Sequence, residues 1–234
     1  MVIGGLQKNS FIDFPGRISC VLFLKGCNFR CPYCHNPELV LGTFQGTQSF
    51  DQKQVLDLLQ ARSGFLEGVV ITGGEPTLQP DLLSLCKTIR ALGYPVKLDT
   101  NGSRPDVLED LFSHGAVDYV AMDIKTDPRR YHGLTPEPLD PTTILTSIRI
   151  IMTSGVPYEF RTTCVKPFVD GGIVRKIGKS IEGAARYALQ TFHQAKCILN
   201  PDFFVSQNGA GYSREEMERL KAIAEPWVEE CILR

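Results

Sequence analysis

The chain has 234 residues, 43% hydrophobic and 22% charged, which is enough to bury the core of one domain. Lysine and arginine number 25 against 26 acidic residues, so the net charge of −1 gives no global electrostatic case for nucleic acid or an anionic membrane as partner. No window approaches the ~18 apolar residues of a membrane span, and the N-terminus lacks a signal peptide pattern. We therefore expect a cytoplasmic protein, in which eight cysteines favour metal binding or free thiols over disulfides.

Predicted strands and helices alternate along the chain. Apolar runs and turn residues predict strands over 18–24, 68–72, 95–100, 117–125, 157–165 and 185–192. Amphipathic periodicity predicts helices over 51–62, 78–92, 105–114, 141–154, 173–181 and from 213 onward. Residues 4–16, ahead of the first strand, are expected to be a lead-in that ends in a turn, and 25–50 is the longest aperiodic segment.

Polar residues in front of three helices are predicted to cap them. The candidates are Ser49 with Gln52, Thr77 alone, and Ser213 with Glu216. These signals fix where the helices of the alternating pattern begin.

Strands that alternate with helices form a parallel sheet with helical crossovers. Six such units fall short of a complete eight-unit barrel, which typically needs about 250 residues. The sequence therefore predicts an α/β fold, a partial (β/α)6 TIM-type barrel of parallel strands, as a single domain over 1–234. A doubly wound open sheet is the alternative architecture, and residues 200–234 are expected to form a C-terminal cap.

Three cysteines in the loop 25–37, here called the cysteine loop, indicate a metal site. Cys27, Cys31 and Cys34 have C-x3-C-x2-C spacing directly after the first strand. A closed structural zinc site needs four ligands, and the adjacent His35 is expected to diverge from Cys34. Three thiolates on an iron–sulfur cluster would leave one iron open to an outside ligand. A zinc knuckle or reduced, packed thiols are the alternatives, and the five scattered cysteines are mostly expected in the core.

In three predicted strands, charged residues occupy alternate positions, so they share one face of the strand. They are Lys97 and Asp99, Asp123 and Lys125, and Glu159 and Arg161 with Thr163. The alternate positions are apolar and suit packing under helices. Buried charge is costly, so we expect these side chains to point into the barrel, where they pair with one another or face a polar ligand. They lie toward the C-terminal ends of their strands, where barrel enzymes build their sites.

Gly73 and Gly74 follow the second strand and precede Glu75 at the same rim. Without side chains at two positions, main-chain groups and the Glu75 carboxylate can approach a ligand's ammonium group closely.

The motif CNFRCPYC resembles the C-x3-C-x-aromatic-C signature of the radical S-adenosylmethionine (SAM) superfamily, with Tyr33 at the aromatic position. The glycine pair with Glu75 resembles the GGE motif of the same superfamily. The resemblance implies a 4Fe–4S cluster whose open iron binds SAM.

Three further segments resemble the glycyl-radical enzyme activases. They are Asp13-Phe14-Pro15-Gly16, His35-Asn36-Pro37, and the DTNG and DIK motifs that begin at Asp99 and Asp123. Together they are similar to the activating proteins of anaerobic ribonucleotide reductase and of pyruvate formate-lyase. The likeness runs from about Gly4 to Arg161 and fades beyond.

The resemblance implies a role for each matching residue. Cys27, Cys31 and Cys34 hold the cluster, the Tyr33 backbone lies near the adenine, and Gly73, Gly74 and Glu75 line the methionine part. A monovalent cation site is matched by Asp99, Thr100 and Asp123. The ligand carboxylate or the substrate would be faced by Lys125 and Arg161. His193 is loosely matched to a histidine near the nucleoside. No general base is nominated.

The implied reaction is reductive cleavage of SAM to a 5′-deoxyadenosyl radical, which abstracts hydrogen from a glycine of a partner enzyme. The partner implied is an anaerobic ribonucleotide reductase. The chain has no ferredoxin-like cysteine run, so a flavodoxin or ferredoxin is expected as electron donor. The alternatives are a radical SAM enzyme that acts on a small molecule, such as a deazapurine synthase, and a non-catalytic metal-binding protein.

Overall fold

The computed structural model describes residues 3–42, 50–131, 133–193, 197–204 and 210–234. Its described strands form one sheet in sequence order: β1 (Ile3–Phe14), β2 (Arg17–Leu24), β3 (Gly68–Gly73), β4 (Val96–Thr100), β5 (Tyr119–Asp123), β6 (Tyr158–Cys164), β7 (Tyr187–Thr191) and β8 (Cys231–Leu233). Strands β2 to β8 are parallel, and β1 pairs antiparallel with β2. The helices are α1 (Pro37–Leu41), α2 (Gln52–Ala61), α3 (Leu82–Ala91), α4 (Pro105–Ser113), α5 (Pro141–Thr153), α6 (Gly171–Ser180) and α7 (Arg214–Ala224).

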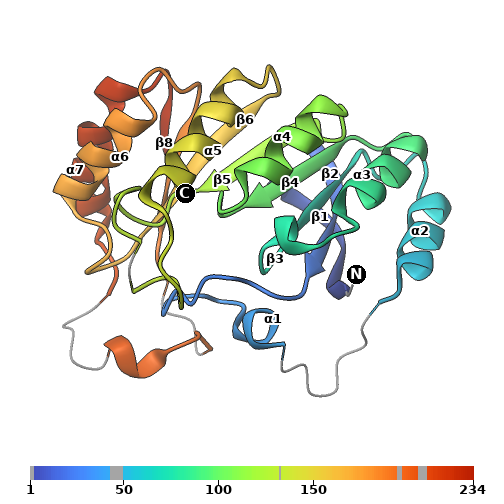
Figure 1. The fold of residues 1–234 in the computed structure, drawn as a ribbon, viewed down its shortest axis with the longest axis horizontal. Helices are drawn as coiled ribbons and strands as arrows, with labels where there is room; N and C mark the ends of the chain where they lie inside the picture. The colour runs from blue at the N-terminus through green and yellow to red at the C-terminus, as the bar shows by residue number, and fades with distance from the viewer. Residues whose placement is uncertain (1–2, 43–49, 132, 194–196, 205–209) are drawn as a thin grey trace.

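The sheet curves, and the helices follow its outer face (Figure 1). Apolar side chains at one parity of the strands pack under these helices, among them Leu98, Met122 and Phe160. The opposite parity faces the inside of the curve. The predicted partial barrel of parallel strands is confirmed, and the doubly wound alternative is not observed.

Two strands at the ends of the sheet were not predicted. Residues 4–16, expected to be a lead-in, form most of β1, because they pair with β2 through a hairpin turn at Pro15 and Gly16. The short strand β8 follows α7 and pairs with β7. Its three residues are too few to give a period that sequence inspection detects.

Two of the three predicted helix caps differ from the structure. Thr77 does not begin a long helix: Pro76–Leu78 is a single 3₁₀ turn, and α3 begins only after Asp81. The reason is Pro80, which disfavours helical geometry at the preceding Gln79. Ser49 lies outside the described residues.

The capping box of α2 is formed by Asp51 and Gln54 rather than by Ser49 and Gln52. The third predicted cap is confirmed, because Ser213 and Glu216 form both bonds of a capping box at α7.

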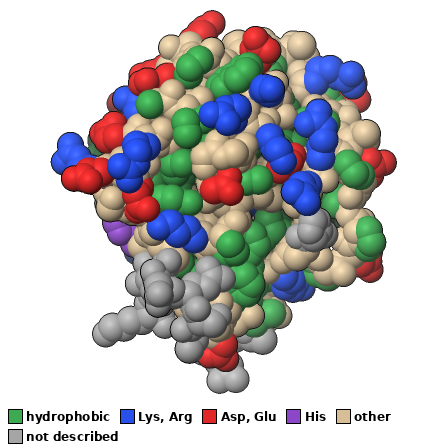
Figure 2. Space-filling view, turned by 90° about the vertical axis from the view of Figure 1, so that its left-hand side faces the viewer, with side chains coloured by type: hydrophobic (Ala, Val, Ile, Leu, Met, Phe, Trp, Pro, Cys, Tyr) green, Lys and Arg blue, Asp and Glu red, His purple; other side chains and the backbone are tan. Residues whose placement is uncertain are grey.

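Charges of both signs are interspersed on the molecular face that carries α6 and α7, as Figure 2 shows. The ion pair Lys166–Glu216, whose carboxylate belongs to α7, contributes to this mixture. Neither positive nor negative side chains dominate this face, which agrees with the net charge of −1. None of the helices in the described ranges is long and apolar enough to cross a bilayer.

Candidate functional site

A cavity of about 490 Å³ opens at the C-terminal ends of the parallel strands. Twelve of the predicted site residues line it: Cys27, Cys31, Tyr33, Cys34, Gly73, Gly74, Glu75, Asp99, Thr100, Asp123, Lys125 and Arg161. His193 does not line it, and its side chain is exposed. Residues that are 134 positions apart in the sequence, Cys27 and Arg161, therefore share one chamber, because parallel strands bring their C-terminal ends to one edge.

The cysteine loop is held from two sides by backbone hydrogen bonds. Arg30 N donates to Leu134 O at 2.7 Å, from the loop that follows β5. On the other side, Leu199 N donates to Cys34 O at 3.0 Å. The loop therefore depends on two segments that are more than 100 residues later in the chain.

Two N–H groups face the sulfur atom of Cys27. Phe29 N lies 3.3 Å from Cys27 Sγ, and Asn101 Nδ2 lies 4.0 Å from the same sulfur. Burial raises the pKa of Cys27 to about 12 and that of Cys31 to about 11, so a bound cation is needed to keep these thiols ionised near neutral pH. N–H groups that face thiolate sulfur are one way in which proteins tune iron–sulfur clusters.

Among the residues that the structure describes, no group of three or more His, Cys, Asp or Glu side chains is arranged to hold one metal ion. The sulfurs that bind a cubane attach to different iron corners and need not converge on one point. The three cysteines are free and line one cavity, so three thiols face the same space, as the ligands of a cluster must.

Aromatic rings pack around the last cysteines of the loop. The Tyr33 ring lies 5.5 Å from that of Phe168 and 6.3 Å from that of Phe192. His35 stacks on Phe192 at 5.6 Å and 3°, and its Nε2 lies 3.0 Å from His193 O. His193 thus meets the site through its backbone.

Gly73, the last residue of β3, lies against β2, and Gly74 lies against the cysteine loop, and neither position leaves room for a side chain. A Cβ on Gly74 would lie 2.0 Å from Gly26 O, and one on Gly73 would lie 2.4 Å from Leu24 N. Gly73 also has φ +120°, which side chains rarely allow. A hydrogen bond from Glu75 N to Gly26 O at 2.8 Å stabilises this close approach.

Glu75 is buried, and its carboxylate joins the ends of β3 and β4. Oε1 accepts hydrogen bonds from Thr77 N at 3.1 Å and from the Thr100 hydroxyl at 2.8 Å. Oε2 accepts one from Asn101 N at 2.6 Å. Burial raises the pKa of Glu75, while these donors oppose the rise. Oε2, with one protein donor, has room for a ligand donor.

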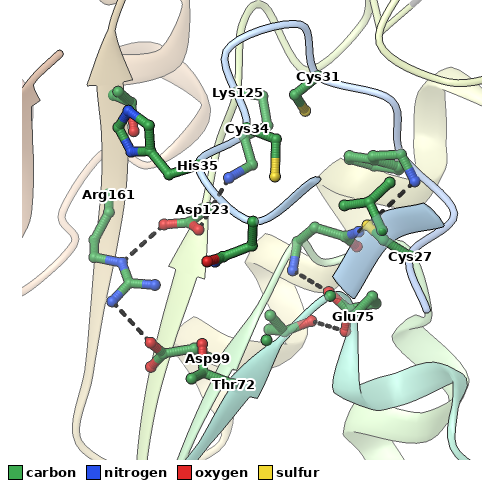
Figure 3. Close-up of a pocket in the computed structure, with 18 of the residues that line it drawn as sticks. Cys27, Cys31, Cys34, His35, Thr72, Glu75, Asp99, Asp123, Lys125 and Arg161 are labelled. Carbon is green, nitrogen blue, oxygen red and sulfur yellow. Dashed lines mark hydrogen bonds and ion pairs between the residues drawn. The ribbon is translucent and has the colours of Figure 1, made fainter. Parts of the chain in front are cut away.

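The inward charges form one network on the cavity wall (Figure 3). Arg161 Nε donates to Asp123 Oδ1 at 2.8 Å and its Nη1 to Asp99 Oδ2 at 3.2 Å. Lys125 Nζ donates to Asp123 Oδ2 at 3.0 Å, and Lys97 donates to Asp99. Burial disfavours the charged form of Asp123, but Arg161 and Lys125 outweigh it and hold the pKa of Asp123 below its usual range. Asp99, Asp123, Lys125 and Arg161 thus pair with one another and also line the cavity, whereas Lys97 is buried and does not line it.

Glu159 has the same parity but belongs to a separate pair. Its two carboxylate oxygens accept from Arg234 at 2.9 and 2.7 Å, and Glu159 is fully buried. Glu159 precedes Arg161 on β6 and is therefore further from the C-terminal end of the strand. Neither Glu159 nor Arg234 lines the cavity.

Several lining residues were given no role from the sequence, among them Asp13 and Asn101. Asp13 lines the cavity from β1, and Asn101 links Cys27 Sγ to Asn28 Oδ1. Both lie inside motifs that the sequence does show, DFPG and DTNG. Their positions depend on contacts between distant strands, which the motifs alone do not reveal.

A family model of the radical SAM superfamily matches residues 21–172. The chain belongs to this superfamily. Radical SAM proteins use a 4Fe–4S cluster and SAM, so these are the cofactors implied for this radical SAM enzyme.

Similar curated proteins are activating enzymes. A Methanocaldococcus jannaschii protein with the provisional name of glycyl-radical enzyme activating enzyme is 32% identical, over all of this chain and 95% of its own length. The pyruvate formate-lyase-activating enzyme of Streptococcus mutans is 30% identical over 82% of this chain and 77% of its own. This radical SAM chain is thus similar to one protein named as an activating enzyme over its full length and to a second over most of it.

Solved radical SAM structures share the fold at low identity. Streptococcus suis SuiB bound to SAM matches with a TM-score of 0.63 at 15% identity, over 92% of this chain. TYW1 with a lysine-pyruvate adduct matches with a TM-score of 0.60 at 15% identity, over 89% of this chain and 72% of its own. The chain spans about half the length of the SuiB structure. These matches support the fold alone.

Proposed function

We propose that this radical SAM enzyme activates a glycyl-radical enzyme, with anaerobic ribonucleotide reductase as the partner. The observation that carries the proposal is the single chamber in which three cysteines, the turn at Gly73 to Glu75 and the paired charges of β4 to β6 come together. Full-length similarity to activating enzymes supports the choice of reaction.

We assign the three cysteines as cluster ligands and the facing wall as the SAM site. Oε2 of Glu75, which has one protein donor, would accept a hydrogen bond from the methionine ammonium. Lys125 and Arg161 would orient the methionine carboxylate, and the Tyr33 backbone would lie at the adenine. His193 would act through its backbone carbonyl, which contacts His35, because its side chain is exposed.

A cluster bound by the three cysteines would supply the one electron that cleaves SAM into methionine and a 5′-deoxyadenosyl radical, and hydrogen transfer from the partner's glycine would give 5′-deoxyadenosine and a glycyl radical. The residues of the chain orient the ligand and exclude water. Asp99 and Asp123 are already neutralised by lysine and arginine, which keeps the wall free of unpaired negative charge. No side chain has to move a proton.

A monovalent cation beside Asp99, Thr100 and Asp123 is a further part of the proposal. It would have to compete with Arg161, which bonds both carboxylates. The Thr100 hydroxyl is directed to Glu75. We therefore expect cation binding only if SAM draws Arg161 away.

We propose that residues 1–234 act as one domain with the cysteine loop at 25–37. Within the proposed cap, 200–234, β8 adds a strand beside β7 and α7 packs against both strands. The turn Pro201–Phe204 packs against the aromatic rings near Tyr33. A low-potential electron donor, a flavodoxin or ferredoxin, would reduce the cluster from outside.

The test uses anaerobically reconstituted protein reduced with dithionite. We expect 5′-deoxyadenosine from SAM, and a glycyl radical signal in electron paramagnetic resonance (EPR) spectra when anaerobic ribonucleotide reductase is added. Absence of 5′-deoxyadenosine would contradict a radical SAM activity. Cleavage without a glycyl radical on the reductase would contradict the proposed partner and leave a small-molecule substrate.

A further inference from the structure

Tyr33 carries a buried hydroxyl group that the rest of the chain does not satisfy. Among the described residues, only Ser19 and Tyr33 have a buried side-chain nitrogen or oxygen atom without a hydrogen-bond partner. Ser19 lies on β2 and does not line the cavity, whereas Tyr33 does. A buried hydroxyl without a partner costs free energy, and buried tyrosine hydroxyls usually find one. The Tyr33 hydroxyl therefore needs an acceptor that the described part of the chain does not provide.

Aromatic packing holds the Tyr33 ring in place. The ring contacts Phe168 and Phe192. Behind these two rings, Phe203 stacks on Phe168 at 5.4 Å and Phe204 packs on Phe192 at 5.8 Å. Tyr33 is 5% exposed, so its ring cannot swing out to water without breaking these contacts. The direction of the hydroxyl is thus fixed by the core around it.

The groups around this hydroxyl belong to the cysteine loop and to the cavity wall. Cys31 is two residues before Tyr33, and the turn between them is closed by Cys34 N, which donates to Cys31 O at 3.0 Å. Burial raises the pKa of Tyr33 well above its usual range, and Cys31, Tyr131 and Asp123 raise it further. The hydroxyl therefore keeps its proton at neutral pH and is a hydrogen-bond donor there.

Of these three neighbours, Cys31 is the one with a free acceptor. Tyr131 Oη already accepts a hydrogen bond from Lys125 N at 2.9 Å, and Asp123 is paired with Lys125 Nζ at 3.0 Å. Burial raises the pKa of Cys31 to about 11, and Tyr33 is among the groups that oppose this rise. The hydroxyl thus lies near the Cys31 sulfur, although the two are outside hydrogen-bond geometry. A metal centre that holds Cys31 as thiolate would turn this sulfur into a strong acceptor.

We propose that the Tyr33 hydroxyl donates a hydrogen bond to sulfur at the Cys31 corner of the bound cluster and thereby raises its reduction potential, an inference that rests on the three cysteines as cluster ligands. Reduction adds one electron to the cluster, and a donor at sulfur stabilises the added negative charge. The side chain of Tyr33 then makes it easier for an outside donor to reduce the cluster. This role is separate from that of its backbone at the adenine.

The experiment compares Tyr33→Phe with the wild type, and Tyr187→Phe is the matched control. Tyr187 is also fully buried, but its hydroxyl donates to Thr162 Oγ1 at 2.8 Å, and it does not line the cavity. Each protein is reconstituted anaerobically, and its iron and sulfide are analysed. The cluster is then titrated with dithionite at defined potentials in the absence of SAM, with the EPR signal of the reduced cluster as readout.

We expect all three proteins to hold the wild-type content of iron and sulfide. In Tyr33→Phe, one-electron reduction of the cluster should become at least tenfold less favourable, which lowers the potential by about 59 mV or more. Tyr187→Phe should keep the wild-type potential, because its hydroxyl has a partner within the protein.

Three results would overturn the proposal and leave the proposed function intact: an unchanged potential in Tyr33→Phe, an equal fall in Tyr187→Phe, or loss of the cluster from Tyr33→Phe. The last would assign the hydroxyl to cluster assembly instead of to the potential. A wild type that binds no 4Fe–4S cluster would overturn the cluster ligands themselves, and with them both the proposed function and this inference.

Discussion

Arg161 Nη1 lies 3.2 Å from Asp99 Oδ2, so one guanidinium group joins β6 to β4 across the intervening β5. Its Nε is bonded to Asp123 on β5 itself, which is the register partner of Arg161. The cavity wall is therefore one preorganised charged surface that spans three strands. The following expectations depend on it and on the cysteine loop opposite.

Removal of the Arg161 charge should destabilise the protein. Arg161→Met leaves Asp99 and Asp123 with one lysine each, so we expect a loss of about 3 kcal/mol in the free energy of unfolding, near the lower end for a broken buried pair. The measurement is urea denaturation. Arg104→Met is the matched control: its pair with Asp106 is exposed, and about 0–1 kcal/mol is expected. Equal losses in the two variants would contradict a structural role for the network.

The contribution of Asp123 to stability should depend on pH with a definite sign. Its pKa is lower in the folded protein than in the unfolded chain, so its contribution is fully present above the unfolded pKa of about 3.9 and is lost as the pH falls below it. The difference in unfolding free energy between wild type and Asp123→Asn should stay constant from about pH 8 to 5 and shrink below about pH 4. Urea titrations of both proteins across this range provide the measurement. A difference that shrinks between about pH 8 and 6 would show that another group dominates.

Gly74→Ala should disturb the cysteine loop. The new Cβ would meet the Gly26 carbonyl at 2.0 Å, which is backbone and cannot rotate away. We expect the reconstituted variant to lose bound iron and most of its SAM affinity, measured by iron content and equilibrium binding. Gly5→Ala is the control, because its Cβ would lie at an ordinary 3.4 Å from Phe23 Cβ. Full iron content in Gly74→Ala would mean that the loop can shift without harm.

The cysteines should divide into two groups on anaerobic reconstitution. Cys27→Ser, Cys31→Ser or Cys34→Ser should each lower bound iron and sulfide at least about tenfold, because each removes one of three ligands. Cys197→Ser should retain the wild-type content, since that side chain is exposed and lies outside the cavity. Iron and sulfide analysis distinguishes the groups. Retention of the cluster after loss of any one of the three would refute their assignment as ligands.

Local patterns in the sequence were sufficient for the architecture and for most of the cavity wall. The alternation of apolar runs with amphipathic helices predicted the six parallel units, since hydrophobic period reports which face of an element is buried. The shared parity of Lys97, Asp99, Asp123 and Arg161 predicted that these charges face inward together. The spacing of the three cysteines and the glycine pair indicated the metal and ligand positions.

Only the tertiary structure decided which of these groups meet. The bond of Arg161 to Asp99 spans 62 residues, and that of Arg234 to Glu159 spans 75. Such contacts depend on strand order, register and sheet curvature, which no local period encodes. Strand β1 is the clearest case. In the sequence Asp13 belongs to a predicted turn, whereas in the structure a register shift against β2 between Ser10 and Phe14 lets Asp13 line the cavity while Phe11 and Ile12 are exposed.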